Sequence, residues 1–127
     1  MNIEKLIFEN VLWNTEYNRK VIPFLREEYF TEGVHKVTFN IINEYFQKYN
    51  KFPDIEAIKV ELSARKDVPT DTFKETFSFI DGFEKSEKDL TWLLDKTEEF
   101  CKDKALYNAL MQAIKIVNEE KSTRVSK

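Results

Sequence analysis

The chain has 127 residues, enough for one domain with a core of its own. Hydrophobic residues make up 42% of it and aromatic residues 14%, a composition that excludes a disordered chain. Twenty basic and twenty-three acidic residues give a net charge of −3 and alternate along the sequence, so the pattern indicates no basic surface for nucleic acid.

The small number of glycine, proline and cysteine residues narrows the fold class. Two glycines and three prolines are too few for the many turns of an all-β fold. A single cysteine excludes an internal disulfide and is typical of a reducing compartment. No apolar run reaches membrane-spanning length, and the N-terminus lacks a signal-peptide pattern. We therefore expect a soluble protein of the cytoplasm, with no membrane partner.

Apolar residues at helical spacing predict an all-α fold, with no strand and no internal repeat. Pro23 and Pro69 should break or kink the chain, and Tyr29 and Phe30 form an aromatic pair expected to be buried near a turn. The predicted helices cover residues 3–12, a short segment capped by Asn14, residues 33–49, a segment capped by Asp54, a segment opened by a Thr72–Glu75 capping box and closed by Gly82, and residues 86–120.

The last of these helices is the feature around which the chain is organised. Ser86 and Asp89 form a weak capping-box pattern, and neither proline nor glycine occurs from there to Glu120. Such a helix is about 50 Å long. A compact domain of this size is only about 36 Å across, so its own domain cannot cover the helix along its full length.

The apolar stripe of this helix changes sides half-way along. At about 100° per residue, the polar stripe of the second half falls where the first half is apolar, so the buried face turns by roughly 180° near Lys104. We interpret the first half as packed on its own domain and the second half as an arm. A larger bundle that sandwiches the whole helix, or a kink near Lys104, is the alternative. The first half carries Leu90, Leu93, Leu94, Thr97, Phe100 and Cys101; the polar stripe of the second half is Asn108, Gln112, Lys115 and Glu119.

The apolar face of the arm is the predicted interaction site. Leaving such side chains in water is costly, since burying each is worth roughly 1.5–3 kcal/mol. We expect this face to bind another copy of the chain, most simply in a two-fold dimer. Its members are Leu106, Tyr107, Leu110, Met111, Ile114 and Val117.

Residues that could carry chemistry are scarce. His35 and Cys101 are the only histidine and cysteine, so the common zinc sites are excluded. A Cys–His nucleophilic pair is formally possible, but the apolar stripe around Cys101 favours a buried structural thiol, and His35 at the start of a helix favours a packing or capping role.

A phosphate-binding loop requires two glycines five residues apart, and Gly33 and Gly82 cannot form one. We therefore expect no catalysis, cofactor or metal in this chain.

A DNA-binding helix-turn-helix is disfavoured. The segments after Asp54 and Thr72 could supply basic contacts, but their connection is long, contains Pro69 and is interspersed with acidic residues. The candidate contacts are Lys59, Arg65, Lys66 and Lys74.

An ordered set of residues between about residue 4 and 118 forms a recognisable pattern. It comprises Tyr17, Val21, Glu28-Tyr29-Phe30, Gly33, Lys36, Thr38-Phe39, Phe52-Pro53, Asp89, Trp92-Leu93, Thr97-Glu98 and Lys104–Ala109. As an ordered set, rather than through any single motif, these residues resemble the N-terminal domain of DnaB-type replicative DNA helicases, most closely those of T-even-like phages. A departure is Phe8-Glu9, where many bacterial members have a glycine pair.

The resemblance implies a globular head, residues 1–85, followed by the first arm of a helical hairpin, residues 86–120, and the start of a linker, residues 121–127. In that family such domains form the collar of a hexameric ring, which docks primase and, in phage, a helicase loader in the primosome. The ATPase domain, with its ATP and magnesium, would lie outside this chain, and DNA would be bound only by the full hexamer. We therefore expect an assembly and docking domain; an independent all-α regulator or adaptor is the alternative.

Overall fold

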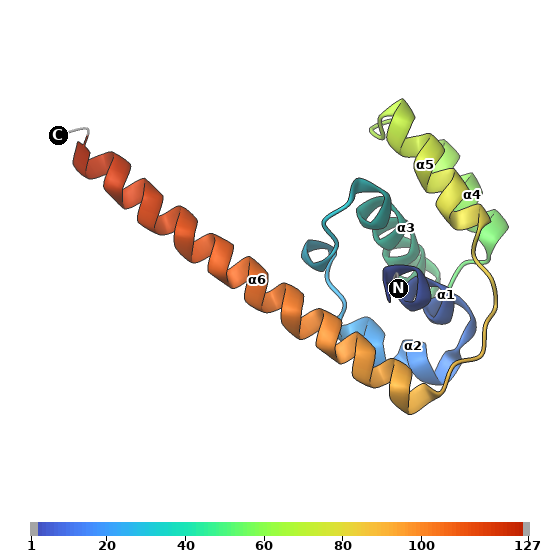
Figure 1. Ribbon diagram of the computed structural model, residues 1–127. Helices are drawn as coiled ribbons and strands as arrows, with labels where there is room; N and C mark the ends of the chain where they lie inside the picture. Colours follow the sequence, from blue (N-terminus) through green and yellow to red (C-terminus); the bar gives the residue numbers. More distant parts are fainter. Residues whose placement is uncertain (1–2, 126–127) are drawn as a thin grey trace.

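The computed structural model describes residues 3–125 and contains no strand in that range, which confirms the all-α prediction. A helical head holds the N-terminus, and the last helix leaves it as a long projection that carries the C-terminus away (Figure 1). The α-helices are α1 Ile3–Trp13, α2 Thr15–Val21, α3 Gly33–Tyr49, α4 Ile55–Ala64, α5 Thr70–Asp81 and α6 Leu90–Val125; two 3-10 helices, η1 Ile22–Phe24 and η2 Glu27–Tyr29, lie between α2 and α3.

A cluster of aromatic rings holds the head together. Phe30 stands at its centre, with ring centroids 5.0 Å from Phe8 on α1, 5.5 Å from Phe39 on α3 and 5.5 Å from Phe100 on α6. Phe30 is fully buried, whereas its neighbour Tyr29 is only partly buried, so the predicted pair contributes one ring to the centre of the core. Aromatic pairs in this distance range add about 0.5–1.5 kcal/mol each beyond the area they bury.

Local capping signals place two helices as predicted. Asn14 accepts a hydrogen bond from the backbone N–H of Tyr17 at 3.1 Å, and Asp54 accepts one from Ala57 at 2.8 Å. Both satisfy a backbone donor that the helix itself leaves open. The predicted Thr72–Glu75 capping box is wrong, because α5 already begins at Thr70, directly after Pro69, and Thr72 lies within its first turn. Proline pre-sets a turn there, and no side chain caps this helix.

Two large aromatic residues of the head remain partly in solvent. Tyr49, at the end of α3, is 49% exposed and packs at a tilt against Tyr45, with ring centroids 4.7 Å apart. It lies in the last turn, directly before Asn50, whose left-handed backbone (φ 56°) ends the helix. Phe77 of α5 is likewise 38% exposed and lies beneath the Lys59 ammonium, 4.9 Å from the ring centroid.

The long helix begins four residues later than predicted. Asp89, not Ser86, is the capping residue, since its carboxylate accepts a hydrogen bond from the backbone N–H of Trp92 at 3.1 Å. Residues 83–89 have no regular secondary structure, and the buried Glu9 carboxylate of α1 accepts a hydrogen bond from the backbone N–H of Glu84 at 2.6 Å. This tie to α1 holds the segment out of the helix until Asp89.

The same helix also ends later than predicted. Residues 121–125 are helical, whereas a loop was expected there, because neither proline nor glycine interrupts them. Residues 126–127 lie outside the described part. With 36 residues, α6 is about 54 Å long.

Candidate interaction surface

The first half of α6 is seated on the head. Its buried side chains are Leu93, Thr97 and Phe100. The Tyr17 hydroxyl of α2 lies 2.7 Å from the Thr97 hydroxyl, and Thr97 in turn donates to the Leu93 carbonyl at 2.8 Å. Burial raises the pKa of Tyr17 well above its ordinary range, so this phenol stays neutral and hydrogen-bonded. The contact is structural and fixes where the arm leaves the head.

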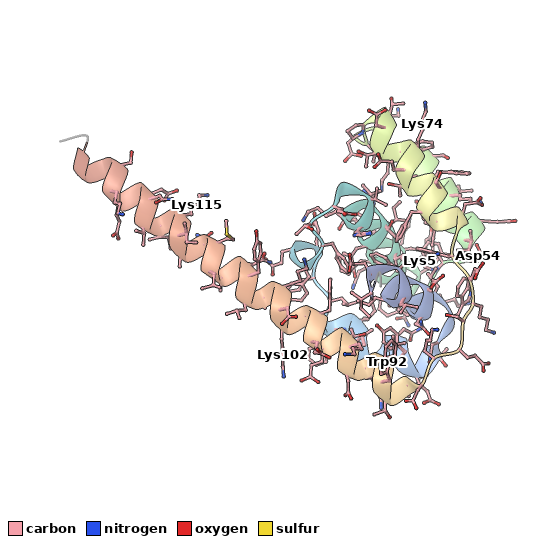
Figure 2. All side chains as sticks on the ribbon, in the orientation of Figure 1. Lys5, Asp54, Lys74, Trp92, Lys102 and Lys115 are labelled. Atoms are coloured by element: carbon pink, nitrogen blue, oxygen red, sulfur yellow. The ribbon has the colours of Figure 1, made fainter. Side chains whose placement is uncertain are left out.

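Contact between α6 and the head ends near Asn108. Its side-chain amide donates to the backbone carbonyl of Glu28 in η2 at 2.9 Å. From Ala109 to Ser122 every side chain is exposed. Figure 2 shows Trp92 on the half beside the head and Lys115 on the half that projects beyond it.

The predicted reversal of the apolar face agrees with this geometry. Asn108 belongs to the polar stripe of the second half, and it continues the side of α6 that faces the head. Leu110 follows it by two residues, about 200° around the helix, and so points away from that side. Among the described residues, no other element of this chain covers the second half of α6, which continues as one helix past Lys104.

All six predicted interface residues lie together on the arm as an exposed strip, which we call the arm face. Their exposed fractions range from 47% for Met111 to 62% for Leu106, high values for large apolar side chains. The sequence-based set omitted Ile116, which flanks the strip and is 48% exposed. An apolar strip of this kind is typical of a protein interface. The arm face comprises Leu106, Tyr107, Leu110, Met111, Ile114 and Val117.

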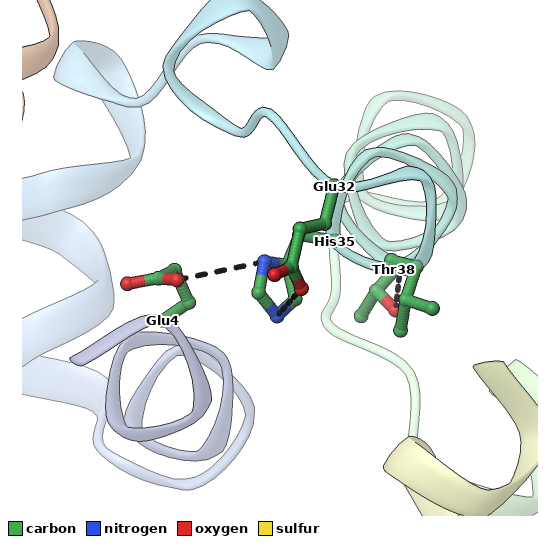
Figure 3. Close-up of polar contacts among 5 residues, drawn as sticks. Glu4, Glu32, His35 and Thr38 are labelled. Atoms are coloured by element: carbon green, nitrogen blue, oxygen red, sulfur yellow. Dashed lines mark hydrogen bonds and ion pairs between the residues drawn. The ribbon is translucent and has the colours of Figure 1, made fainter. Parts of the chain in front are cut away.

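His35 is a packed core residue, as predicted. It is 4% exposed, and its two ring nitrogens lie 3.6 Å from the Glu4 carboxylate of α1 and 3.7 Å from that of Glu32, just before α3 (Figure 3). The ring of Phe79 lies 5.1 Å away, between centroids. His35 therefore joins α1 to the start of α3.

Cys101 is partly buried on α6, less than predicted, and this burial raises the pKa of its thiol. A raised pKa makes the thiol a poorer nucleophile, which supports a structural role. Within residues 3–125 no three His, Cys, Asp or Glu side chains are grouped so that they could hold a metal ion. In the same range, no helix combines the length and apolar character needed to cross a bilayer.

The geometry thus defines a class: an all-α head that carries a projecting helix with an exposed apolar strip. No protein-family profile matches the chain. The chain is similar, however, to a DnaB-like replicative helicase of Enterobacteria phage T4, with 29% identity over 112 residues. The match covers 88% of this chain and 23% of the phage protein, so the chain spans about a quarter of its relative's length. This confirms the resemblance drawn from the sequence and relates the chain to one part of a replicative helicase.

Proposed function

We propose that this chain is the assembly and partner-docking domain of a phage replicative DNA helicase, acting in the cytoplasm of the bacterial host. The observation that carries the proposal is the arm face, a continuous apolar strip on a helix that no other described part of the chain covers. The similarity to a replicative helicase supplies the context, since ring-forming helicases require surfaces that join one copy to the next.

In this proposal the arm face binds a second copy of the chain. A strip that pairs with its own equivalent gives a closed two-fold contact, which is the commonest symmetry among homo-oligomers. Higher assembly into a ring would then use further contacts of the longer protein. Primase and a helicase loader are the docking partners that the family resemblance implies, while ATP hydrolysis and DNA binding belong to regions beyond this chain.

A matched pair of substitutions tests the arm face. Leu110→Glu places a charge in the middle of the strip, whereas Val60→Glu places the same charge on α4 of the head, at a residue that is somewhat more exposed (67% against 56% for Leu110). We expect Leu110→Glu to lower self-association by at least about tenfold, because burying an unpaired carboxylate is costly. Val60→Glu should leave self-association unchanged.

Light scattering after size-exclusion chromatography measures association, and circular dichroism checks that both variants keep their helices. If Leu110→Glu unfolds the chain, the arm belongs to the domain's own core and the proposal fails. If both variants associate like the wild type, the arm face is not the interface. The genomic sequence distinguishes a helicase domain from an independent regulator. If the chain is a helicase domain, the reading frame should continue past Lys127 into a phosphate-binding motif.

A further inference from the structure

A second surface of the head lies around η1, on the side where α2 meets the base of α6. Pro23 of η1 lines two grooves at once. One, of about 510 Å³, runs between η1 and α6 and is also lined by Leu94 and Cys101. The other, of about 700 Å³, runs between η1, α2 and the turn after α3, and is also lined by Phe52. Phe24 also lines the first groove, among residues of α2 and α6. The two grooves together are here called the η1 surface.

The η1 surface has an excess of positive charge that the chain as a whole lacks. Lys20 and Arg26 line the first groove, and Arg19 and Lys51 line the second. All four side chains are exposed, and within residues 3–125 none forms a hydrogen bond or an ion pair with another side chain.

The negative charge at the η1 surface is already neutralised. Glu98 is the sole acidic residue among those lining the two grooves, and Lys102 donates a hydrogen bond to its carboxylate at 2.7 Å. This hydrogen bond lowers the pKa of Glu98, so the carboxylate stays ionised beside its partner. Within residues 3–125, these four cations therefore give the η1 surface a local positive charge that no other side chain neutralises, on a chain whose net charge is −3.

The η1 surface also presents apolar side chains. Phe24 is 68% exposed, the most exposed of the large hydrophobic residues in the described part of the chain. In the second groove the rings of Phe46 and Phe52 stack with centroids 4.5 Å apart and form an aromatic wall. A ligand that fits must therefore bring apolar side chains for the grooves and negative charge for their rims.

We propose that the η1 surface binds an acidic peptide segment of a partner protein, with apolar side chains entering the grooves and carboxylates meeting Lys20, Arg26, Arg19 and Lys51. This deepens the docking role proposed above and rests on it, because it names where a partner binds and with what chemistry. Rim charges of this kind set partner choice and the rate of association, while the buried apolar groups supply most of the affinity.

Single-stranded nucleic acid fits the η1 surface less well. Proteins that bind single strands present several aromatic rings on which successive bases stack, along a groove that tracks the phosphates. Here Phe24 is one protruding ring, and the net negative charge of the chain repels a long polyanion. An apolar and acidic peptide needs only the local charge.

Selection from a displayed random-peptide library tests the proposal without a known partner. The library is selected on the wild-type chain and counter-selected on the Lys20→Glu, Arg26→Glu double variant. We expect the enriched peptides to combine Asp or Glu with Phe, Trp or Leu. Enrichment of neutral or basic sequences, or the absence of any enrichment over the double variant, would overturn the proposal.

Titration of one enriched peptide, labelled with a fluorophore, then locates the site. Lys20→Glu with Arg26→Glu should weaken peptide binding by at least about tenfold, and Phe24→Ala should weaken it measurably. All three residues are exposed, so these substitutions should leave the core of the head intact. Lys66→Glu with Lys74→Glu is the matched control, because it makes the same change in charge on exposed residues of the α4–α5 region. Equal weakening by test and control variants would contradict the site.

Two further arms complete the experiment. Tighter binding of an oligothymidylate than of the peptide to the η1 surface would indicate a nucleic-acid ligand and overturn the proposal. Leu110→Glu should leave peptide binding unchanged, because the arm face lies outside the η1 surface. Loss of peptide binding would therefore contradict the η1 surface alone, and loss of self-association would concern the arm face alone.

Discussion

The hydrogen bond between Tyr17 and Thr97 provides the sharpest test of how the arm is anchored. Both residues are buried, with 0% and 3% exposed, and lie 80 positions apart in the sequence. Since Thr97 donates its proton to the Leu93 carbonyl, Tyr17 must be the donor to Thr97. The two single substitutions therefore leave different groups unpaired.

Tyr17→Phe removes one hydrogen bond and leaves no buried donor behind, so it should cost about 1 kcal/mol of unfolding free energy. Thr97→Val keeps the Tyr17 hydroxyl buried without its acceptor, so it should cost more, about 1–3 kcal/mol. In the double variant no hydroxyl is left unpaired. We therefore expect its cost to fall below the sum of the two single costs by about 1 kcal/mol.

Urea unfolding of the four proteins, followed by circular dichroism at one low protein concentration, measures this cycle. A fixed concentration is needed because self-association would add to apparent stability. The slope with denaturant should be the same in all four. Costs that add to within about 0.3–0.5 kcal/mol would show that the two hydroxyls do not interact, and would refute this account of the anchor.

Three further predictions follow from the same residues and from the composition. Burial raises the pKa of Tyr17 above its ordinary value near 10, so on raising the pH the unfolded chain loses this proton before the folded chain does. The stability that the neutral phenol contributes is therefore fully present below about pH 10 and is lost as the pH rises further. Urea unfolding should show a smaller loss of stability at high pH in Tyr17→Phe than in the wild type. The chain should show no ATP hydrolysis, because Gly33 and Gly82 cannot form a phosphate-binding loop, and steady turnover in a preparation free of other helicases would contradict this. Binding of single-stranded DNA at physiological salt should be weak, given the net charge of −3, and sub-micromolar affinity in fluorescence anisotropy would contradict the assignment.

Features that depend on local or periodic sequence were predictable. Asn14 and Asp54 cap their helices because capping needs only a side chain and the backbone three residues on. The arm was predictable for a similar reason, since the length and the apolar phase of a helix are read directly from spacing. Asn108 and Leu110 lie on opposite sides of α6, and two residues at 100° each suffice to place them so.

Features that depend on distant residues were not predictable. Ser86 and Asp89 are both good capping residues, and the choice between them is made by the Glu9 carboxylate, which binds the backbone of Glu84 from another helix. The η1 surface was missed because Phe52 and Cys101 lie 49 positions apart, and no spacing rule brings them to grooves on either side of η1. Net charge concealed it as well, because its local excess of cations is cancelled elsewhere in the chain.

Pairing of the arm face with another copy of this chain is tested most directly by sedimentation equilibrium of the wild-type chain, from low to high micromolar concentration. We predict an apparent mass that rises with concentration from 15.2 kDa toward twice that value, because the six apolar side chains of the arm face become buried in a dimer. A mass that stays at 15.2 kDa at high micromolar concentration would contradict the claim.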